Sequence, residues 1–362
     1  MGIDEAYGYR LVAVGESLER VELPNLEPGP EEVIVKVAGC GICHTDVGFA
    51  IEGVPTRKAL PLVLGHEISG RVVAAGNNAT AWLRRTVIVP AVIPCGVCPA
   101  CRAERLTICR NQFMPGNDGD GGFATHVRVP ARGLCPVPEP LPPGLSTEFL
   151  SVIADAVTTP WEAIRRAGVT PDDVAVFVGV GGVGGFGVQI AAALGAAVVA
   201  IDIDPSKLEL AAQHGAGLTL NSSSMNERDL KVAVRNFAKQ SGKRGIGLKI
   251  FETSGTPAGQ QTAFALLDFG GYLAVVGFTP KKVELRLSNL MALDATARGN
   301  WGCPPDQYPG ALALVLRGEV AIAPYVELYP LDDAPAVFAA VARHAVARRV
   351  ILKVSNGNED KP

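Results

Sequence analysis

A glycine-rich stretch between two apolar segments constrains the fold of this chain more than any other feature. Residues 173–178 read Asp-Val-Ala-Val-Phe-Val, and residues 179–184 read Gly-Val-Gly-Gly-Val-Gly. A small, apolar, helix-like segment follows over 185–194, and a second apolar strand covers 197–202. Strand, glycines, helix and strand in this order are typical of a dinucleotide-binding βαβ unit, whereas the glycines alone would fit any tightly packed βαβ unit. The order predicts a doubly wound parallel sheet.

Each glycine of this loop has an expected task. Gly179 permits the tight turn, Gly181 lets the backbone approach a pyrophosphate, and Gly184 lets the helix pack close to the sheet. Asp202 stands eighteen residues beyond Gly184, at the end of the second strand. Its carboxylate suits the adenosine ribose and repels a 2′-phosphate, which predicts NAD in preference to NADP. The other loop positions expected at the cofactor are Gly182 and Val183.

The alternation of strands and helices continues to about residue 298. Strands are expected near 218, 248–252 and 271–277, with helices over 205–214, 226–240 and 257–267. We therefore assign residues 157–298 to an NAD-binding domain, and further cofactor contacts are expected at Lys207, Thr253 and Gly277. Residues 1–156 are mostly short alternating strands separated by turn residues, which predicts a barrel-like β domain to which residues 299–362 return.

Composition and charge narrow the class of protein. The chain has 362 residues, 48% of them hydrophobic, and is longer than one hydrophobic core usually organises. Two domains are therefore expected. The net charge of −3, with both signs interspersed, argues against nucleic acid or a membrane as partner. The first residues lack the basic and apolar regions of a signal peptide, so a cytoplasmic location is expected.

Four cysteines within fifteen residues form the strongest metal motif. Cys95, Cys98, Cys101 and Cys109 follow the spacing C-x2-C-x2-C-x7-C, which can close a tetrahedron around a structural zinc ion. An iron–sulfur cluster is the chemical alternative. Disulfides and reduced core cysteines fit the sequence less well, because no signal peptide is expected and charged residues surround the cluster.

A second set of metal-ligand residues lies earlier in the chain. Cys43 falls in the stretch Gly39–Asp46, and His66 and Glu67 follow a glycine about twenty residues later. Thiolate, imidazole and carboxylate are the groups that bind zinc. A buried histidine without a metal is the alternative for His66.

Together these motifs resemble the zinc-containing medium-chain alcohol dehydrogenases over essentially the whole chain. The resemblance rests on GHEISG at 65–70, the four-cysteine segment, VGVGGVGG at 178–185 and the domain order. It implies a GroES-like catalytic domain beside a Rossmann domain, two zinc ions per chain and NAD. Cys43 and His66 would bind the catalytic zinc, with Asp155 as third ligand where many members have cysteine. Glu67 would be a neighbouring partner of the site or an alternative ligand.

The resemblance also implies roles around the reacting centre. Thr45 would accept the alcohol proton and pass it to the cofactor ribose, although a threonine there could merely cap a helix. His44 would approach the pyrophosphate, Thr159 would contact the nicotinamide, and Asn300 is a further expected cofactor contact. Many members have a histidine three residues past the hydroxyl, where this chain has Gly48, so the later proton path is unassigned.

Shorter stretches resemble a narrower group of these enzymes, which act in anaerobic benzoyl-CoA degradation. They are AGCGICHTD, PLVLGHEISGRVVAAG, VPAVIPCGVC, MPGND, ADAVTTP, ETSGTPAGQ, LRLSNLMA and GNWGC. This resemblance implies a CoA thioester substrate, 6-hydroxycyclohex-1-ene-1-carbonyl-CoA, oxidised at carbon 6 to the 6-oxo compound. Conjugate hydride addition to an enoyl-CoA is a further possible activity, and Arg57 and Lys58 are candidates for binding the CoA tail.

Two other functions compete with this substrate. One is oxidation of a free secondary, aryl or polyol alcohol by the same zinc and NAD chemistry. The other is a non-catalytic NAD-binding regulator. A homodimer or homotetramer is expected by analogy, with contacts near the sheet edge at 271–287.

Overall fold

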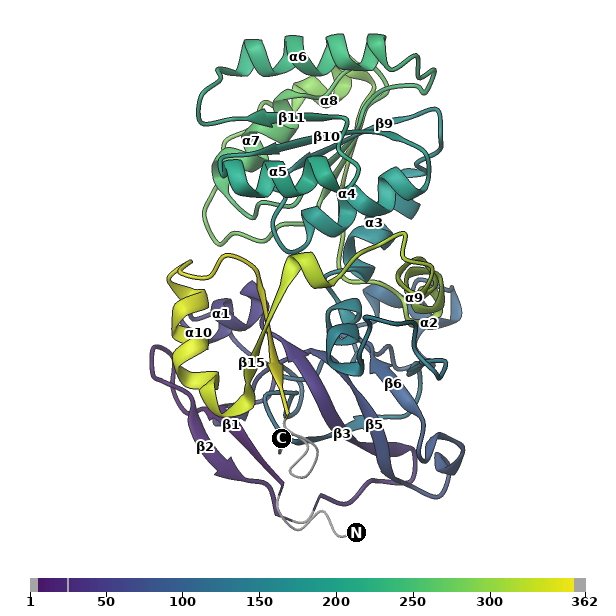
Figure 1. Ribbon diagram of the computed structural model, residues 1–362, viewed down its shortest axis with the longest axis vertical. Helices are drawn as coiled ribbons and strands as arrows, with labels where there is room; N and C mark the ends of the chain where they lie inside the picture. Colours follow the sequence, from purple (N-terminus) through teal and green to yellow (C-terminus); the bar gives the residue numbers. More distant parts are fainter. Residues whose placement is uncertain (1–5, 25, 355–362) are drawn as a thin grey trace. The chain divides into compact units, whose positions relative to one another are not determined.

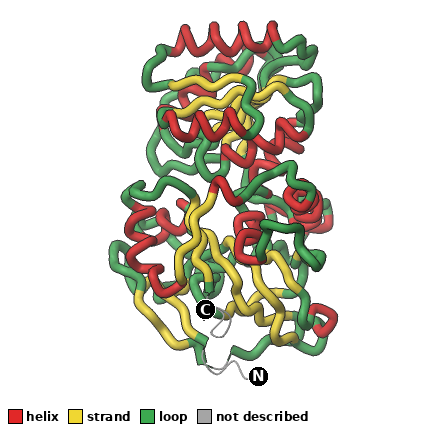
Figure 2. Tube along the Cα trace, viewed as in Figure 1, coloured by secondary structure: helices red, strands yellow, loops and turns green. Residues whose placement is uncertain are grey.

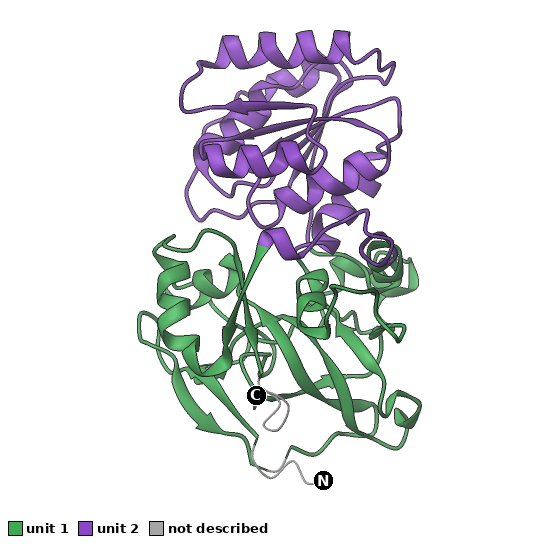
Figure 3. Cartoon of the chain, viewed as in Figure 1, with its two compact units in different colours: residues 1–155, 302–312, 326–362 green, residues 156–301, 313–325 purple. Residues whose placement is uncertain are grey.

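The computed structural model describes residues 6–24 and 26–354, and the chain divides into two compact units (Figure 3). Unit 1 comprises residues 1–155, 302–312 and 326–362, and unit 2 comprises residues 156–301 and 313–325. From the sequence, residues 1–156 and 299–362 are expected in the first domain, but the structure places 156, 299–301 and 313–325 in unit 2. The Gln189 side chain holds the segment 313–325, because it donates to the Ala321 carbonyl (3.2 Å) and accepts from the Ala321 amide (2.7 Å).

Unit 2 is built on a six-stranded sheet with the order β11-β10-β9-β12-β13-β14, in which all neighbours are parallel. The strands are β9 (Val174–Val178), β10 (Ala197–Asp202), β11 (Leu218–Asn221), β12 (Lys249–Glu252), β13 (Tyr272–Val275) and β14 (Thr296–Gly299). Every residue of β9 is buried, as expected for a central strand covered on both faces. The predicted doubly wound sheet is confirmed. The expected edge at 271–287 is wrong, because β14 pairs with β13 and forms the edge itself.

Helices cover both faces of this sheet (Figure 1). One face carries α4 (Gly184–Ala193) and α5 (Pro205–Gln213), with α3 (Thr158–Ala167) packed against α4; the other carries α6 (Glu227–Gln240), α7 (Pro257–Ala265) and α8 (Ser288–Leu293). Capping residues in the sequence define where several of these helices begin. Asp204 accepts from the Ser206 amide at the start of α5, and Thr256 accepts from the Gly259 amide at the start of α7; each is followed by proline.

Unit 1 contains two β-sheets, drawn in yellow in Figure 2. The larger has the order β15-β16-β3-β5-β6-β8, with β7 also pairing with β3, and the smaller has the order β2-β1-β4. The strands are β1 (Tyr7–Leu11), β2 (Glu19–Glu22), β3 (Glu32–Gly41), β4 (Leu62–Val63), β5 (Glu67–Ala75), β6 (Thr86–Val89), β7 (His126–Pro130), β8 (Cys135–Pro136), β15 (Val326–Pro330) and β16 (Arg349–Lys353). Inward residues such as Val33, Val35 and Ile68 share one core with Phe123 and Phe338.

Short helices connect the strands of unit 1. They are α1 (His44–Ala50), α2 (Pro99–Arg102) and α10 (Ala334–Ala342), with 3-10 helices η1 (Thr80–Trp82), η2 (Leu106–Ile108), η3 (Thr147–Ala154), η4 (Pro305–Gln307) and η6 (Leu331–Asp333). Helix α9 (Tyr308–Leu316) passes from unit 1 into unit 2, where η5 (Ala323–Tyr325) follows. Within 6–24 and 26–354, no helix has both the length and the apolar character needed to cross a membrane.

Candidate catalytic metal centre and cofactor site

Four side chains from distant parts of unit 1 converge on one point. Cys43, His66, Glu67 and Asp155 each bring a ligand atom within 4.8 Å of the others. The Cys43 Sγ and His66 Nε2 atoms each lie 3.7 Å from Asp155 Oδ2. Ligand atoms of this kind on a tetrahedral zinc ion are about 3.5 Å apart. Cys43, His66 and Asp155 therefore fit a zinc ion with small adjustments, and three ligands leave a fourth position for a substrate.

The strands and η3 place these ligands. Cys43 follows β3 and precedes α1, while His66 directly precedes β5. Strands β3 and β5 pair antiparallel with Gly41 opposite Glu67, so their ligand-bearing ends meet. Asp155 follows the buried last residues of η3, and the Tyr308 hydroxyl donates to the Ala154 carbonyl (2.5 Å), which fixes the backbone beside the ligand.

Asp46 is a supporting residue of the metal site that the sequence did not identify. Its carboxylate accepts from the Cys43 amide (3.0 Å) and the Gly65 amide (3.2 Å), and its Oδ1 lies 3.3 Å from His66 Nδ1. Burial by itself lowers the pKa of His66, but the carboxylates of Asp46 and Asp155 raise it well above its usual range. Asp46 thus faces Nδ1 of His66, whereas Nε2 faces Asp155. The rule that a ligating histidine pairs its other nitrogen with a carboxylate could have pointed to Asp46.

Glu67 forms a buried ion pair with Arg349, which the sequence also did not reveal. Arg349 Nε donates to Glu67 Oε2 (2.8 Å), and Arg349 Nη2 contacts Glu67 Oε1. The Glu67 side chain is fully buried and that of Arg349 is 7% exposed. Burial raises the pKa of Glu67 to about 7, although Arg349 opposes this. Both carboxylate oxygens of Glu67 are therefore engaged beside the three ligands.

Thr45 and His44 occupy the first turn of α1. Thr45 Oγ1 lies 3.7 Å from Cys43 Sγ, and the N-cap of α1 is Cys43. Thr45 is thus not the cap of this helix, and its hydroxyl lies next to the ligand sulfur. The His44 ring stacks on His344 with 5.2 Å between ring centroids.

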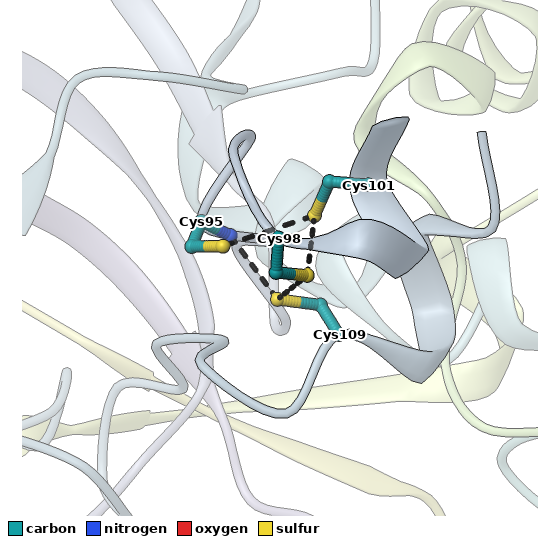
Figure 4. A group of neighbouring side chains, drawn as sticks. All are labelled: Cys95, Cys98, Cys101 and Cys109. Carbon is teal, nitrogen blue, oxygen red and sulfur yellow. Dashed lines mark hydrogen bonds between the residues drawn. The ribbon is translucent and has the colours of Figure 1, made fainter. Parts of the chain in front are cut away.

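The four cysteines at 95–109 form a second, separate ligand group (Figure 4). The sulfur atoms are 3.5 Å apart for Cys98 and Cys101, 3.7 Å for Cys98 and Cys109, and 3.9 Å for Cys95 and Cys101. The edge of a zinc–thiolate tetrahedron is about 3.8 Å. Hydrogen bonds from the backbone amides of Val97 and Cys98 lower the pKa of Cys95 to about 6, which favours the thiolate. All eight cysteines lie in the described part of the chain, where no disulfide bond joins them.

Replacing Cys98 by serine is expected to remove one zinc ion per chain and to lower the free energy of unfolding by at least about 3 kcal/mol. The reason is that small zinc-bound loops obtain most of their folding energy from the metal. Metal analysis and denaturant unfolding test this. The control is Cys135→Ala, because Cys135 is buried outside the cluster. A Cys98→Ser protein that keeps both zinc ions would contradict the assignment.

The glycine loop of unit 2 has the geometry expected of a dinucleotide site. Gly179 has φ +89°, a conformation that favours glycine, and a Cβ on Gly184 would collide with the Gly179 carbonyl oxygen. Around Gly181, by contrast, no heavy atom of the described residues, its chain neighbours aside, lies within 4 Å of a Cβ position, so the backbone there is open to a ligand. Asp202 ends β10, and its Oδ2 accepts from the Val180 amide (2.8 Å), which links the second strand to the loop. Helix α4 begins at Gly184 with Val183 as N-cap.

The remaining predicted cofactor residues of unit 2 lie in four places. The Thr253 hydroxyl donates to the Gly179 carbonyl (2.5 Å), so Thr253 supports the glycine loop. Asn300 Nδ2 donates to the Thr159 carbonyl (3.2 Å), which brings these two residues together. Lys207 lies on α5 with Nζ 4.0 Å from Asp204. Gly182 lies within the loop, and Gly277 follows β13.

Two family models match the chain. The alcohol dehydrogenase GroES-like domain matches residues 29–139, and the zinc-binding dehydrogenase model matches residues 182–317. The fold and the two ligand groups thus define a zinc-containing dehydrogenase. The chain belongs to the zinc-containing medium-chain alcohol dehydrogenase family.

Named relatives agree with this membership. An alcohol dehydrogenase of Geobacillus stearothermophilus is 31% identical over 93% of this chain and 95% of its own length. The L-threonine 3-dehydrogenase of Pyrococcus abyssi is 31% identical over 78% of each chain. Among solved structures, galactitol-1-phosphate dehydrogenase from Escherichia coli superposes with a TM-score of 0.85 at 25% identity, covering 96% of this chain and 99% of its own.

The family membership confirms several predictions. The chain is an enzyme, an NAD-dependent alcohol dehydrogenase with zinc and NAD as cofactors. The GroES-like and Rossmann-type fold classes are confirmed. The alternative of a non-catalytic regulator is therefore not retained.

Proposed function

We propose that this enzyme oxidises a free secondary, aryl or polyol alcohol, with Cys43, His66 and Asp155 as ligands of the catalytic zinc. The observation that carries the proposal is the convergence of these three ligand atoms beside the Thr45 hydroxyl. Free alcohols are favoured because the relatives are named for such substrates: alcohol, L-threonine, L-galactonate and galactitol 1-phosphate.

Individual residues of the chain have distinct proposed roles in this reaction. When bound, zinc supplies a Lewis acid for the hydroxyl oxygen of the substrate, and NAD accepts the hydride. Thr45 is proposed to take the hydroxyl proton, because its oxygen lies beside the Cys43 sulfur. Asp46 faces Nδ1 of His66, and Arg349 pairs with Glu67, which follows the ligand His66. Gly48 offers no side chain for a further relay, so the proton leaves Thr45 by another route.

Replacing Asp202 by asparagine is expected to raise the ratio of kcat/KM for NADP to that for NAD about 100-fold. The variant loses the negative charge that repels a 2′-phosphate, and such repulsion amounts to several kcal/mol. The ratio is informative because the two cofactors differ only in this phosphate. Asp204→Asn is the control, since Asp204 caps α5 and asparagine also caps helices. Equal ratios in the two variants would refute the role of Asp202.

A CoA thioester is the second candidate substrate. Its support is the set of eight stretches that resemble 6-hydroxycyclohex-1-ene-1-carbonyl-CoA dehydrogenase. The structure gives less support to the assignment of Arg57 and Lys58 to the CoA tail. Arg57 pairs with Asp118 (3.1 Å), and Lys58 pairs with Asp120 (2.7 Å). Each cation already has a carboxylate partner in the loop at 116–122, and this loop packs largely buried against its neighbours. A CoA phosphate would therefore compete with these carboxylates for Arg57 and Lys58.

A substrate panel separates the two candidates. The purified enzyme is assayed for NADH formation with free secondary, aryl and polyol alcohols and with a cyclic allylic alcohol as its CoA thioester. Higher kcat/KM for a free alcohol supports the proposal. Turnover of the CoA ester alone would overturn it in favour of the second candidate, and reduction of a dienoyl-CoA by NADH would then test the conjugate addition.

A homodimer through unit 2 is also proposed. Strand β14 is an edge strand whose four residues are all exposed, and Leu287 and Met291 nearby are 68% and 78% exposed. Exposed strand edges with apolar neighbours are prone to pair with another chain. A mass twice that of the chain by sedimentation would support a dimer, and a monomer at micromolar concentration would contradict it.

A further inference from the structure

The turn after β12 joins two segments of unit 2 that are assigned to the cofactor. Glu252 is the last residue of β12 and pairs in register with Val178, the last residue of β9. Strand order reverses between β9 and β12, because β10 and β11 lie on one side of β9 and β13 and β14 lie beyond β12. Ligands of open parallel sheets bind at the carboxyl ends of the strands at this point. Glu252 therefore stands where a dinucleotide is expected.

One oxygen of Glu252 organises the turn. Its Oε1 accepts from the Ser254 amide (2.9 Å), the Ser254 hydroxyl (2.6 Å) and the Gly255 amide (3.1 Å). The Glu252 side chain is completely buried. Three donors on one buried acceptor fix the backbone from Glu252 to Gly255 in a single conformation.

The turn at 253–255 also contacts both predicted cofactor loops, one at Gly179 and the other at Gly277. The Thr253 hydroxyl bonds to the Gly179 carbonyl (2.5 Å), and the Ser254 Cα lies 2.5 Å from the position of a Gly179 Cβ. On the other side, the Gly255 backbone approaches Gly277 so closely that a Cβ on Gly277 would collide with it. A displacement of the turn would therefore move both glycines.

The second oxygen of Glu252 is unusual. Its Oε2 is buried next to the Gly277 backbone, 2.8 Å from the position of a Gly277 Cβ, and among the described residues no well-aligned hydrogen bond reaches it. An unsatisfied buried carboxylate oxygen costs stability. Burial raises the pKa of Glu252 accordingly. If Glu252 served only to fill space, an apolar residue would do so without this loss of stability. A role beyond packing is therefore expected.

We propose that Glu252 is a positioning residue for dinucleotide binding, which holds the turn 253–255 and thereby the backbone of Gly179 and Gly277 at the cofactor. The inference rests on the assignment of NAD to unit 2. It predicts that loss of the Oε1 acceptor weakens cofactor binding, whereas a side chain that keeps one oxygen there preserves it.

The test measures NADH affinity of the full-length enzyme by fluorescence titration, with thermal unfolding in the absence of NADH. Glu252→Ala is expected to raise the Kd for NADH at least tenfold and the KM for NAD similarly, with kcat at saturating NAD reduced less than threefold. Glu252→Gln retains an oxygen for the three donors and is expected to stay within threefold of the wild-type Kd. Ser254→Ala removes one of the three bonds and is expected to weaken binding about threefold.

Asp268 provides a matched control at the opposite end of β12. Its Oδ1 accepts from the Leu248 amide (2.8 Å), one residue before the strand begins. Asp268→Ala is expected to lower the unfolding temperature but to leave the Kd for NADH within twofold of wild type. An unchanged Kd in Glu252→Ala, or equal weakening in both alanine variants, would overturn the proposal. If Glu252→Ala does not fold, an unchanged Kd in Ser254→Ala overturns it instead. Failure of the wild-type enzyme to bind NADH would refute the cofactor assignment itself.

Discussion

Replacing Asp155 by alanine is expected to remove one of two zinc ions per chain and to lower kcat about a thousandfold or more, while the protein stays folded. Asp155 Oδ2 lies 3.7 Å from both Cys43 Sγ and His66 Nε2, so its loss leaves two ligands. A catalytic metal contributes several kcal/mol to transition-state stabilisation, and each 1.36 kcal/mol corresponds to a factor of ten in rate. Metal analysis, kcat and far-ultraviolet circular dichroism, all measured on one sample, test the loss of zinc, the loss of rate and the retention of the fold.

Asp155→Cys is the matched variant for this prediction. Thiolate carries the same charge as carboxylate and is a softer zinc ligand, so this variant is expected to keep both zinc ions. Asp155→Ala would be uninformative if it unfolded, whereas the cysteine variant distinguishes a ligand from a folding residue. Two zinc ions retained in Asp155→Ala would show that another residue completes the site.

Replacing Arg349 by methionine is expected to lower the free energy of unfolding by about 3–5 kcal/mol. The change leaves the Glu67 carboxylate buried without its partner, and removal of one member of a buried ion pair has costs of this size. Chemical denaturation measures the effect, and a loss below about 1 kcal/mol would show that the pair is not important for folding.

Two further variants isolate the pair. Arg348→Met changes the neighbouring arginine, which is exposed, and is expected to alter stability by less than about 0.5 kcal/mol. The double variant Glu67→Gln with Arg349→Met removes both charges and is expected to recover a large part of the stability, because a buried neutral pair avoids the unpaired charge. Equal losses in the single and double variants would contradict this explanation.

Asp46 and Arg349 show where local sequence patterns stop being informative. Asp46 was visible in the stretch around Cys43, but its partners Gly65 and His66 come from the segment directly before another strand, β5. Arg349 lies 282 residues from Glu67 in the sequence. A buried glutamate requires a compensating cation, yet nothing local indicates which of 33 lysines and arginines supplies it.

The basic pair at Arg57 and Lys58 illustrates the same limit for a substrate hypothesis. On the sequence alone, two adjacent cations are available for an anionic ligand. In the structure, the loop at 116–122 supplies Asp118 and Asp120 to them. Whether a surface cation has an ion-pair partner depends on which loop folds next to it. The order of the loops in the sequence does not predict that neighbour.

The sequence by itself determined the features whose parts lie close together in the chain. The glycine loop with its flanking strand and helix, Asp202 after it, and the four cysteines of 95–109 are each formed by short-range contacts, because turns and ligand spacings of a few residues restrict the backbone directly. Family resemblance added Asp155, which no local pattern connects with Cys43.

Only the tertiary structure decided the pairings between distant segments. Strand β3 lies between β5 and β16, with Gly41 opposite both Glu67 and Ile351, and this register brings Arg349 to Glu67. The parallel order of unit 2 likewise places Glu252 next to Val178 and leaves β14 at the edge. Such pairings depend on which strands become neighbours, and neighbours in a sheet are selected by the burial of whole faces rather than by the residues at the ends of the strands.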